Sequence, residues 1–201
     1  MRNIKPLVLF TVLSSSIQAN ESLNNNIEPI ENSGWLLALG QVSLDAQKAA
    51  AEGIKNSATY VKLGWETQND SLLFGLGISG YLYSDYARFS QKVESNFGNK
   101  STEKSSAESV NFYLEGGYNF NLTEHIDLQA LIGMEVVIQS ERGIANCSDC
   151  YSSDINIDGG LYINPRIRFN TSEALNFYVG YHSYMSGDVN SALSLALSYT
   201  Y

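Results

Sequence analysis

The sequence predicts an all-β fold, an eight-stranded antiparallel up-and-down transmembrane β-barrel. Three observations lead to this prediction. Eight stretches alternate apolar with small or polar residues, short and long connections take turns between them, and aromatic residues gather at one end of the strands. The composition agrees with a β-rich domain, because 44% of the 201 residues are hydrophobic, only 16% are charged, and Gly and Tyr are abundant.

The first 33 residues precede the alternating pattern. Arg2 and Lys5 lead into an apolar stretch that is too short to span a bilayer and is followed by the small residue Ala19, as in a cleaved secretory signal peptide. The alternative, a buried N-terminal strand or helix, has no neighbouring segment to pack against. We therefore expect a signal peptide over residues 1–19, a flexible periplasmic lead-in over 20–33 and an outer-membrane β-barrel over 34–201.

Each predicted strand has one apolar face. The first strand, about residues 34–44, is the least regular, and the others alternate with a period of two. In chain order, the apolar faces are Trp35, Leu37 and Leu39; Val61, Leu63 and Trp65; Leu72, Phe74, Leu76, Ile78 and Leu82; Phe112, Leu114, Gly116, Tyr118, Phe120 and Leu122; Ile126, Leu128, Ala130, Ile132, Met134 and Val136; Leu161, Ile163, Pro165, Ile167 and Phe169; Leu175, Phe177, Val179 and Tyr181; and Leu193, Leu195, Leu197, Tyr199 and Tyr201.

Alternation alone does not say which face meets the solvent, because a soluble lipocalin-like barrel alternates as well and points its apolar residues inward. The connections favour the membrane barrel. Residues 69–70, 123–125 and 171–174 form tight turns, whereas residues 45–56, 84–107 and 139–154 form long polar loops, and only the last link, 186–190, is of modest length. Short periplasmic turns and longer outer loops are typical of an outer-membrane barrel.

Aromatic residues on the apolar face gather near the strand ends that meet the tight turns or the termini. Such a ring is expected where a membrane meets water. The predicted girdle consists of Trp35, Trp65, Phe74, Tyr118, Phe120, Phe169, Phe177, Tyr199 and Tyr201. The terminal Tyr201, at the end of an alternating strand, also resembles the assembly signal that the barrel-assembly machinery recognises.

The opposite, inward faces carry a nearly balanced set of charges. The predicted lumen charge network consists of Lys62, Glu66, Glu115, Asp127, Glu135, Arg166 and Arg168. An eight-stranded barrel is just wide enough to be filled by its own side chains, and charges enclosed there must pair or keep water. We expect a polar plug that rigidifies the barrel, with a narrow ion path gated by these pairs as the alternative.

Two cysteines, Cys147 and Cys150, stand close together in one of the long loops. In an exported chain such a pair is expected to be oxidised, whereas a zinc site would need two further ligands that the sequence does not offer. We therefore predict a small loop disulfide, and no metal site or cofactor.

No catalytic residues are predicted, so we do not expect an enzyme. Small barrels that modify lipid A use a Ser and a His near the outer rim. Here His182 is followed directly by Ser183, and adjacent strand residues point to opposite faces, so the two cannot act as one nucleophile and base. Ser186, in the following loop, could still approach His182, which leaves a lipid A-modifying hydrolase as a further alternative.

The formal charge of the whole chain is -9, and loss of Arg2 and Lys5 with the signal peptide would make the mature chain more negative. This balance argues against nucleic acid as a partner. The expected partners are outer-membrane lipid and lipopolysaccharide, the barrel-assembly machinery, and a host or cell-surface ligand at the loops.

With these strands, turns, loops and Tyr201, the chain from Gly34 onward resembles the small eight-stranded outer-membrane β-barrel family that includes the OmpA transmembrane domain and OmpX/Ail-like proteins. The resemblance rests on architecture, without a diagnostic motif. It implies a structural or surface-interaction role, in adhesion or envelope integrity, through the extracellular loops. The alternative function is a narrow, porin-like channel for small solutes.

Overall fold

The computed structural model of the protein describes residues 31–94, 100–144, 150–172 and 174–201. The predicted signal peptide and residues 20–30 of the predicted lead-in lie outside the described residues. In chain order, the elements are β1 (Glu31–Leu44), α1 (Ala46–Ala51), β2 (Ile54–Asn69), β3 (Leu72–Asp85), β4 (Ser90–Glu94), β5 (Lys100–Lys104), β6 (Ser106–Asn121), β7 (Ile126–Gly143), β8 (Ser153–Asp154), β9 (Leu161–Asn170), β10 (Leu175–Tyr184) and β11 (Val189–Thr200).

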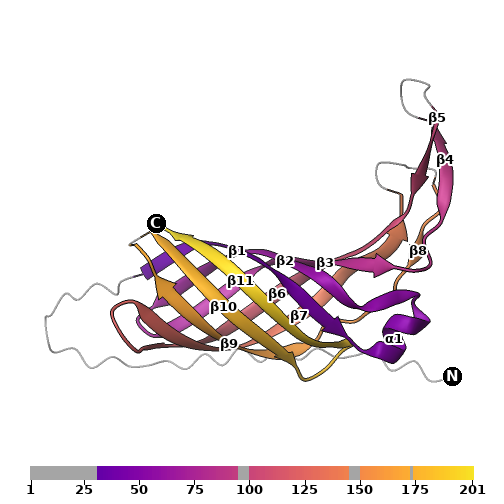
Figure 1. Cartoon of the computed structure of the whole chain (residues 1–201). Helices are drawn as coiled ribbons and strands as arrows, with labels where there is room; N and C mark the ends of the chain where they lie inside the picture. The colour runs from indigo at the N-terminus through magenta and orange to yellow at the C-terminus, as the bar shows by residue number, and fades with distance from the viewer. Residues whose placement is uncertain (1–30, 95–99, 145–149, 173) are drawn as a thin grey trace, which may run out of the picture.

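Eight of these strands close into a barrel (Figure 1). Their order around the ring is β1, β2, β3, β6, β7, β9, β10 and β11, and β11 pairs with β1 to complete it. Each neighbouring pair is antiparallel. Closure leaves no unpaired edge in the ring. The register therefore confirms the predicted eight-stranded antiparallel β-barrel.

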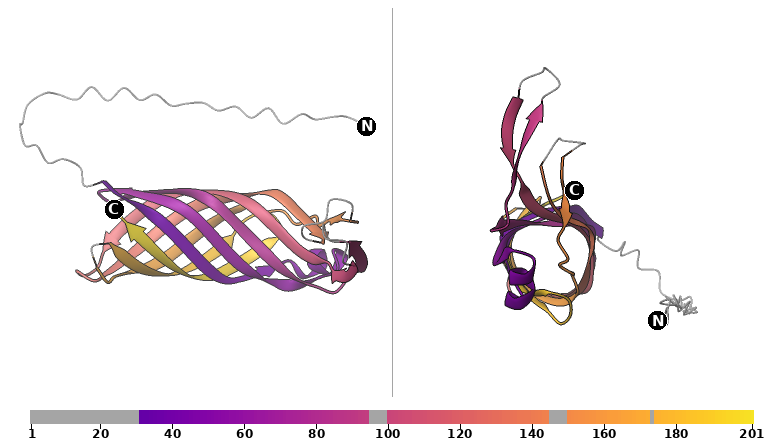
Figure 2. Two further views of the ribbon diagram at one scale, coloured as in Figure 1. Left: turned by 90° about the horizontal axis from the view of Figure 1, so that it is seen from above. Right: turned by 90° about the vertical axis from the view of Figure 1, so that its right-hand side faces the viewer.

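The two ends of the barrel differ (Figure 2). One end, which we call the turn end, carries the tight connections β2–β3, β6–β7 and β9–β10, together with the first residue of β1 and the C-terminus. Asp70 makes the β2–β3 turn possible with a positive φ of 52°. The opposite end, the loop end, carries α1, the hairpin β4–β5 and β8. Short and long connections are thus separated onto opposite ends.

Side chains alternate between the outside and the lumen along each barrel strand. On β3, Leu72, Phe74 and Leu76 are exposed, whereas Leu73 and Tyr81 are buried. Since successive residues of a strand point to opposite faces, the predicted apolar faces all lie outside and the polar faces line the lumen. The protein is therefore apolar on its outer wall and polar within.

β1 begins three residues earlier than predicted. Glu31, Asn32 and Ser33 pair with β2, Ser33 Oγ donates to Thr67 Oγ1 at 3.0 Å, and Tyr201 N donates to Ser33 O at 3.0 Å. These three residues therefore belong to the barrel and not to the predicted flexible lead-in. The prediction missed them because strand pairing uses backbone groups, so a polar stretch can pair without showing an apolar face.

The predicted long loops contain regular structure. In residues 45–56, Asp45 caps α1 by accepting a hydrogen bond from Lys48 N at 2.8 Å. In residues 84–107, β4 and β5 pair as a separate two-stranded hairpin. A polar stretch at the loop end can therefore form a helix or a hairpin, and it is not necessarily irregular. Among the described residues, no helix is both long and apolar enough to cross a bilayer.

Large and small side chains share the lumen, and the large ones come from both halves of the ring, since β9 and β10 contribute Tyr162, Tyr178, His182 and Tyr184. Tyr60, Tyr81 and Tyr113 come from β2, β3 and β6, while β1, β10 and β11 contribute Ala38, Gly180, Ala192 and Ser194. Two glycines in the wall admit tyrosines: a Cβ on Gly64 would collide with the Tyr113 hydroxyl, and a Cβ on Gly133 would lie 2.5 Å from Tyr162 Cζ. The lumen is therefore filled by side chains that cross it.

Apolar side chains gather inside the loop end. This cluster joins buried residues of the barrel wall, such as Val42 and Val189, to Ala49 of α1 and to Ile155 and Ile157 of the segment between β8 and β9. Burial of these side chains from loop segments fixes the loops onto the barrel. The mouth at this end is consequently packed with apolar groups.

Candidate functional site

The outer wall is the first candidate surface, because it is apolar and exposed. Its exposed residues include Leu37 at 47%, Ile132 at 58% and Leu195 at 65%, from strands all around the ring. An exposed apolar band of this extent is far larger than the patches that soluble monomers leave in water. The geometry is suited to contact with lipid chains.

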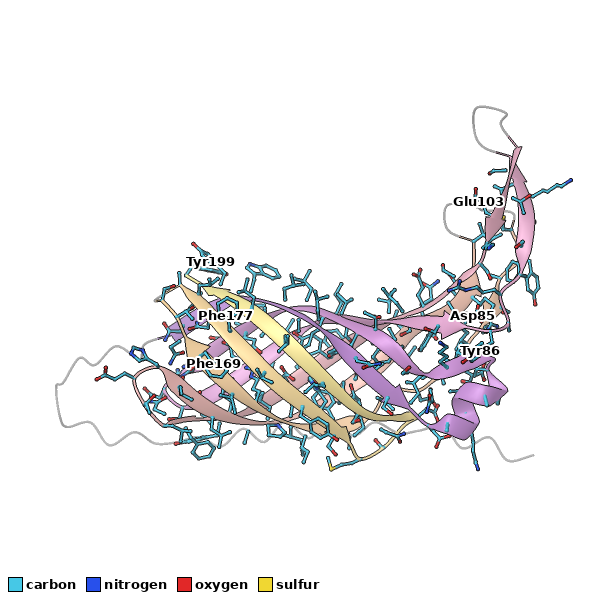
Figure 3. The ribbon with its side chains drawn as sticks, viewed as in Figure 1. Asp85, Tyr86, Glu103, Phe169, Phe177 and Tyr199 are labelled. Atoms are coloured by element: carbon cyan, nitrogen blue, oxygen red, sulfur yellow. The ribbon has the colours of Figure 1, made fainter. Side chains whose placement is uncertain are left out.

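The predicted aromatic girdle lies on this wall toward the turn end. Figure 3 shows Phe169, Phe177 and Tyr199 there, and the register places Trp35 directly beside Tyr199 and Trp65. Phe74, Tyr118, Phe120 and Tyr201 are exposed as well, whereas Trp65 is half-buried. Tyr118 and Phe120 have ring centroids 4.9 Å apart. The structure therefore brings these residues to one end of the outer wall.

The predicted lumen charges meet in the barrel interior. Lys62 Nζ lies 2.8 Å from Glu115 Oε1, and Arg166 Nη1 lies 2.6 Å from Glu66 Oε1 and 3.7 Å from Glu115 Oε1. β2 and β9 stand opposite each other in the ring, so the Arg166–Glu66 pair spans the lumen. Nearer the turn end, Arg168 Nη2 contacts Asp127 Oδ2 at 2.5 Å. Six of the seven predicted residues are thus joined as ion pairs.

Glu135 is held differently from the other six residues. Its carboxylate accepts hydrogen bonds from Ser79 Oγ, from Tyr81 Oη at 2.5 Å and from Tyr184 Oη. Tyr81 Oη and Tyr184 Oη lie 3.4 Å apart although β3 and β10 are on opposite sides of the ring. At this second level of the lumen, side chains from opposite walls therefore meet, and their hydroxyl groups surround the Glu135 carboxylate.

Tyrosines and amides complete the interior, and the prediction did not include them. Tyr162 Oη donates to Glu115 Oε2 at 2.9 Å, Arg166 Nε donates to Gln129 Oε1 at 2.5 Å, and Lys62 Nζ lies 3.8 Å from the Tyr113 ring centroid. The period-two pattern could have found them, since each stands on the polar face of its strand. They supply the partners that enclosed charges require.

A further ion pair closes the loop end and was also missed. Arg142 Nε lies 2.7 Å from Asp85 Oδ2, and Arg142 Nη2 donates to Glu52 O at 2.7 Å. Asp85 is labelled at this end in Figure 3. Both residues lay in segments that were predicted to be loops, where no strand face could be assigned. The pair ties β7 to β3 and to the end of α1.

His182 does not form a hydrolase site with the serines considered above. It is 1% exposed inside the lumen, with its ring centroid 5.0 Å from that of Tyr162 and 5.7 Å from that of Tyr60. Neither ring nitrogen has a hydrogen-bond partner among the described residues, and Ser186 Oγ instead accepts from Leu161 N at 3.0 Å. The Ser186 approach that a lipid A-modifying hydrolase would need is therefore not present.

Outside the lumen, the loop-end elements contact one another. The hairpin β4–β5 rises away from the barrel axis in Figure 1, and Phe89 at its base has its ring centroid 5.1 Å from that of Tyr151. Tyr151 N donates to Gln91 Oε1 at 3.0 Å. The hairpin is thus anchored to the segment before β8. Cys147 lies outside the described residues, and with it the predicted disulfide to Cys150.

Comparison with known proteins gives similarities at low identity. No family model and no curated protein matches the chain. Among solved structures, Neisserial surface protein A is 8% identical with a TM-score of 0.49, covering 85% of this chain and 97% of that chain. Ail, the attachment invasion locus protein of Yersinia pestis, is 15% identical with a TM-score of 0.43, covering 85% and 97%. The N-terminal β-barrel domain of Pseudomonas aeruginosa OprF is 12% identical with a TM-score of 0.42, covering 85% and 98%.

Proposed function

We propose that this chain is an outer-membrane β-barrel whose plugged lumen makes it a rigid anchor, and whose loop end contacts molecules at the cell surface. One observation carries the proposal: polarity is inverted, with an exposed apolar wall outside and paired charges inside. A barrel of this kind is stable in a bilayer, where backbone groups must be satisfied internally. The turn end then faces the periplasm and the loop end faces outward.

The loop end supports a role in surface interaction because its elements are held in place. Asp45 N donates to Asp188 O at 2.8 Å, Lys48 Nζ lies 3.7 Å from Asp188 Oδ2, and Asp188 N donates to Asp158 O at 3.0 Å. These contacts join α1, the β10–β11 connection and the segment before β9. A preformed surface loses less conformational entropy on binding than flexible loops would lose.

The interior supports an anchor in preference to the channel alternative. Arg166–Glu66 and Tyr81–Tyr184 each join opposite walls, and the apolar cluster packs the loop-end mouth. Moving solute through this lumen would require breaking enclosed ion pairs, which is costly. The function that the geometry supports best is therefore surface contact from a sealed barrel.

The experiment removes the hairpin without touching the barrel. Ser105 N donates to Phe89 O at 3.0 Å, so residues 90–104 can be replaced by Asn-Gly, a two-residue hairpin turn. Cells that carry the full chain, the trimmed chain or no insert are compared for adhesion to cultured epithelial monolayers and for survival in bile salts. We expect the full chain to raise adhesion and the trimmed chain to lose that gain.

Two controls make this result interpretable. Both proteins must shift in apparent mass when boiled before electrophoresis, which shows that each barrel is folded. Equal adhesion by the full and trimmed chains would contradict a role for the hairpin. Reduced survival in bile salts with unchanged adhesion would instead assign the loop end to envelope integrity.

A further inference from the structure

A polar groove lies on the outer wall at the loop-end margin of the apolar band. It encloses about 340 Å³ and is formed by β1, the start of β2, β10 and β11. Its lining includes the amides of Gln41 and Asn56 and the hydroxyls of Ser43, Ser57 and Ser191, with Tyr181 and Leu193 on the apolar side. Toward the loop end, outward positions on other strands are polar too, with Ser84, Glu108 and Gln139 exposed, but here the polar groups line a hollow in the wall.

The groove begins where the outward residues change from apolar to polar. Along β1 the outward residues Leu37 and Leu39 are followed by Gln41 and Ser43, and β11 changes in the same way between Leu193 and Ser191. Ser43 pairs with both Ser57 of β2 and Ser191 of β11, so three short side chains stand side by side across three strands. Small residues on adjacent strands leave the wall hollow at this level.

The backbone of β2 adds to the hollow. The pairing of β2 with β3 shifts register between Ile54 and Ala58, so Asn56 and Ser57 lie outside the ladder with β3. Irregularities of this kind re-aim side chains at the rims of barrels. Asn56 is consequently exposed at the edge of the groove, although on a regular strand it would share the inward face of the buried Ala58.

The polar side chains of the groove are available to a ligand. None of the side chains of Gln41, Ser43, Asn56, Ser57 and Ser191 hydrogen-bonds to another residue in the part of the chain that the structure describes. In the lumen, by contrast, the side chains of Ser79 and Ser198 both make hydrogen bonds. The groove therefore presents a set of neutral donors and acceptors that face outward.

The chemistry of the lining selects a class of ligand. Amides and hydroxyls beside an exposed tyrosine ring suit a saccharide, which offers many hydroxyl groups and apolar ring faces. No Lys or Arg lines the groove, and two lysines of α1 and the start of β2 have partners of their own: Lys48 Nζ lies 3.7 Å from Asp188 Oδ2, and Lys55 Nζ lies 5.6 Å from the Tyr86 ring centroid. The lining thus favours neutral sugar groups over phosphate.

We propose that this groove binds the saccharide headgroup of a glycolipid in the leaflet that surrounds the loop end. The occupant is a membrane glycolipid and not a free glycan, because the apolar side of the groove at Leu193 continues along the outer wall to the paired Leu39 and Leu195, an apolar track for acyl chains. The proposal rests on the proposed outer-membrane location. It assigns residues to a lipid contact that the surface-interaction role does not require.

The test measures glycolipid binding to the full chain folded in detergent micelles. The filled variant combines Ser43→Leu, Ser57→Leu and Ser191→Leu, and a matched control places Ser84→Leu and Gln139→Leu at exposed positions of β3 and β7. Native mass spectrometry counts bound deep-rough lipopolysaccharide on each protein. We expect the filled variant to bind at least about tenfold more weakly and the control to bind within about twofold of the original chain.

Two further probes test whether binding depends on phosphate and whether it requires the acyl chains. Dephosphorylated lipid A should bind within about twofold of the phosphorylated form, because the groove has no cation for phosphate. Free glucosamine disaccharide without acyl chains should bind much more weakly. Equal binding by the filled variant, dependence on phosphate, or equal binding of the free disaccharide would each overturn the proposal.

The failure of the proposed function gives a different result. A chain that does not shift in apparent mass on boiling and stays soluble without detergent is not a membrane barrel, and both proposals then fall together. The other outcome is that the original chain and the filled variant both shift in apparent mass on boiling, and the filled variant still binds lipopolysaccharide as well as the original chain. That result would overturn only the glycolipid groove.

Discussion

At the residue scale, the most constrained group is the Glu115 carboxylate. It contacts Lys62 Nζ at 2.8 Å, Arg166 Nη1 at 3.7 Å and Tyr162 Oη at 2.9 Å, and its side chain is fully buried. Each charge in this cluster is stable only because the others are present. The cluster therefore behaves as one unit and not as a set of independent pairs.

Replacing Glu115→Gln should destabilise the barrel strongly. The change leaves Lys62 and Arg166 enclosed with one carboxylate fewer, a cost of about 3–5 kcal/mol in the free energy of unfolding. Urea titration in phospholipid vesicles measures this cost. The control is Glu124→Gln, the same change at an exposed turn, which should stay within about 0.5 kcal/mol of the original. A small effect at Glu115 would mean that water already reaches the cluster.

The contact between Gly133 and Tyr162 gives a second residue-scale prediction. Adding a methyl group by Gly133→Ala should destabilise the barrel by about 1–3 kcal/mol, because the three nearest atoms all belong to the Tyr162 side chain. In a Tyr162→Leu background the same change should cost less. A double-mutant cycle on the free energy of unfolding measures this coupling, and strict additivity would refute the contact.

At the element scale, the pairing of β9 with β10 has one gap. The register runs from Gly180–Arg166 to Ser183–Ile163, and no pair is formed at Tyr181–Pro165 or His182–Asn164, although the register is unchanged across the gap. Proline has no N–H to donate, which explains the missing rung. Asn164 Oδ1 and the His182 ring also lack hydrogen-bond partners among the described residues beside this gap.

Restoring this rung should stabilise the wall. Pro165→Val supplies an N–H and a residue that favours strands, so we expect the free energy of unfolding to rise by about 0.5–1.5 kcal/mol. Hydrogen exchange should then show a protected amide at position 165. Ile163→Val, at the next outward position of β9, serves as the control. It should raise neither the free energy of unfolding nor the protection of amides from hydrogen exchange. Equal or lower stability for Pro165→Val would contradict the account of the gap.

At the scale of the whole molecule, inverted polarity and a filled lumen predict a barrel that is folded in membranes and does not conduct. In planar bilayers, the folded protein should show no resolvable single-channel steps, because Arg166–Glu66 and Tyr81–Tyr184 join opposite walls. The recordings should use only preparations in which all of the protein shifts in apparent mass on boiling, since these contain folded barrels. Regular openings that change with Arg166→Ala would instead support the channel alternative.

The sequence by itself determined the class of fold and the two faces of the wall. The period of two on strands such as Leu193 to Tyr199 fixed which residues stand outside, and Lys62, Glu115 and Arg166 were placed inside by the same rule. Local patterning suffices for these features, because the side to which a residue points depends only on its position along its own strand. The lengths of the connections in turn separated the short turns from the long loops.

Only the tertiary structure decided which inward residues meet. Arg166 and Glu66 are 100 residues apart in the chain and come together because closure places β9 opposite β2. The same is true of Glu135, which pairs with hydroxyl groups in place of a cation, and of Ser43, Ser57 and Ser191, whose adjacency depends on the register of three strands. A sequence states which face a side chain occupies, whereas closure, stagger and register determine its neighbours.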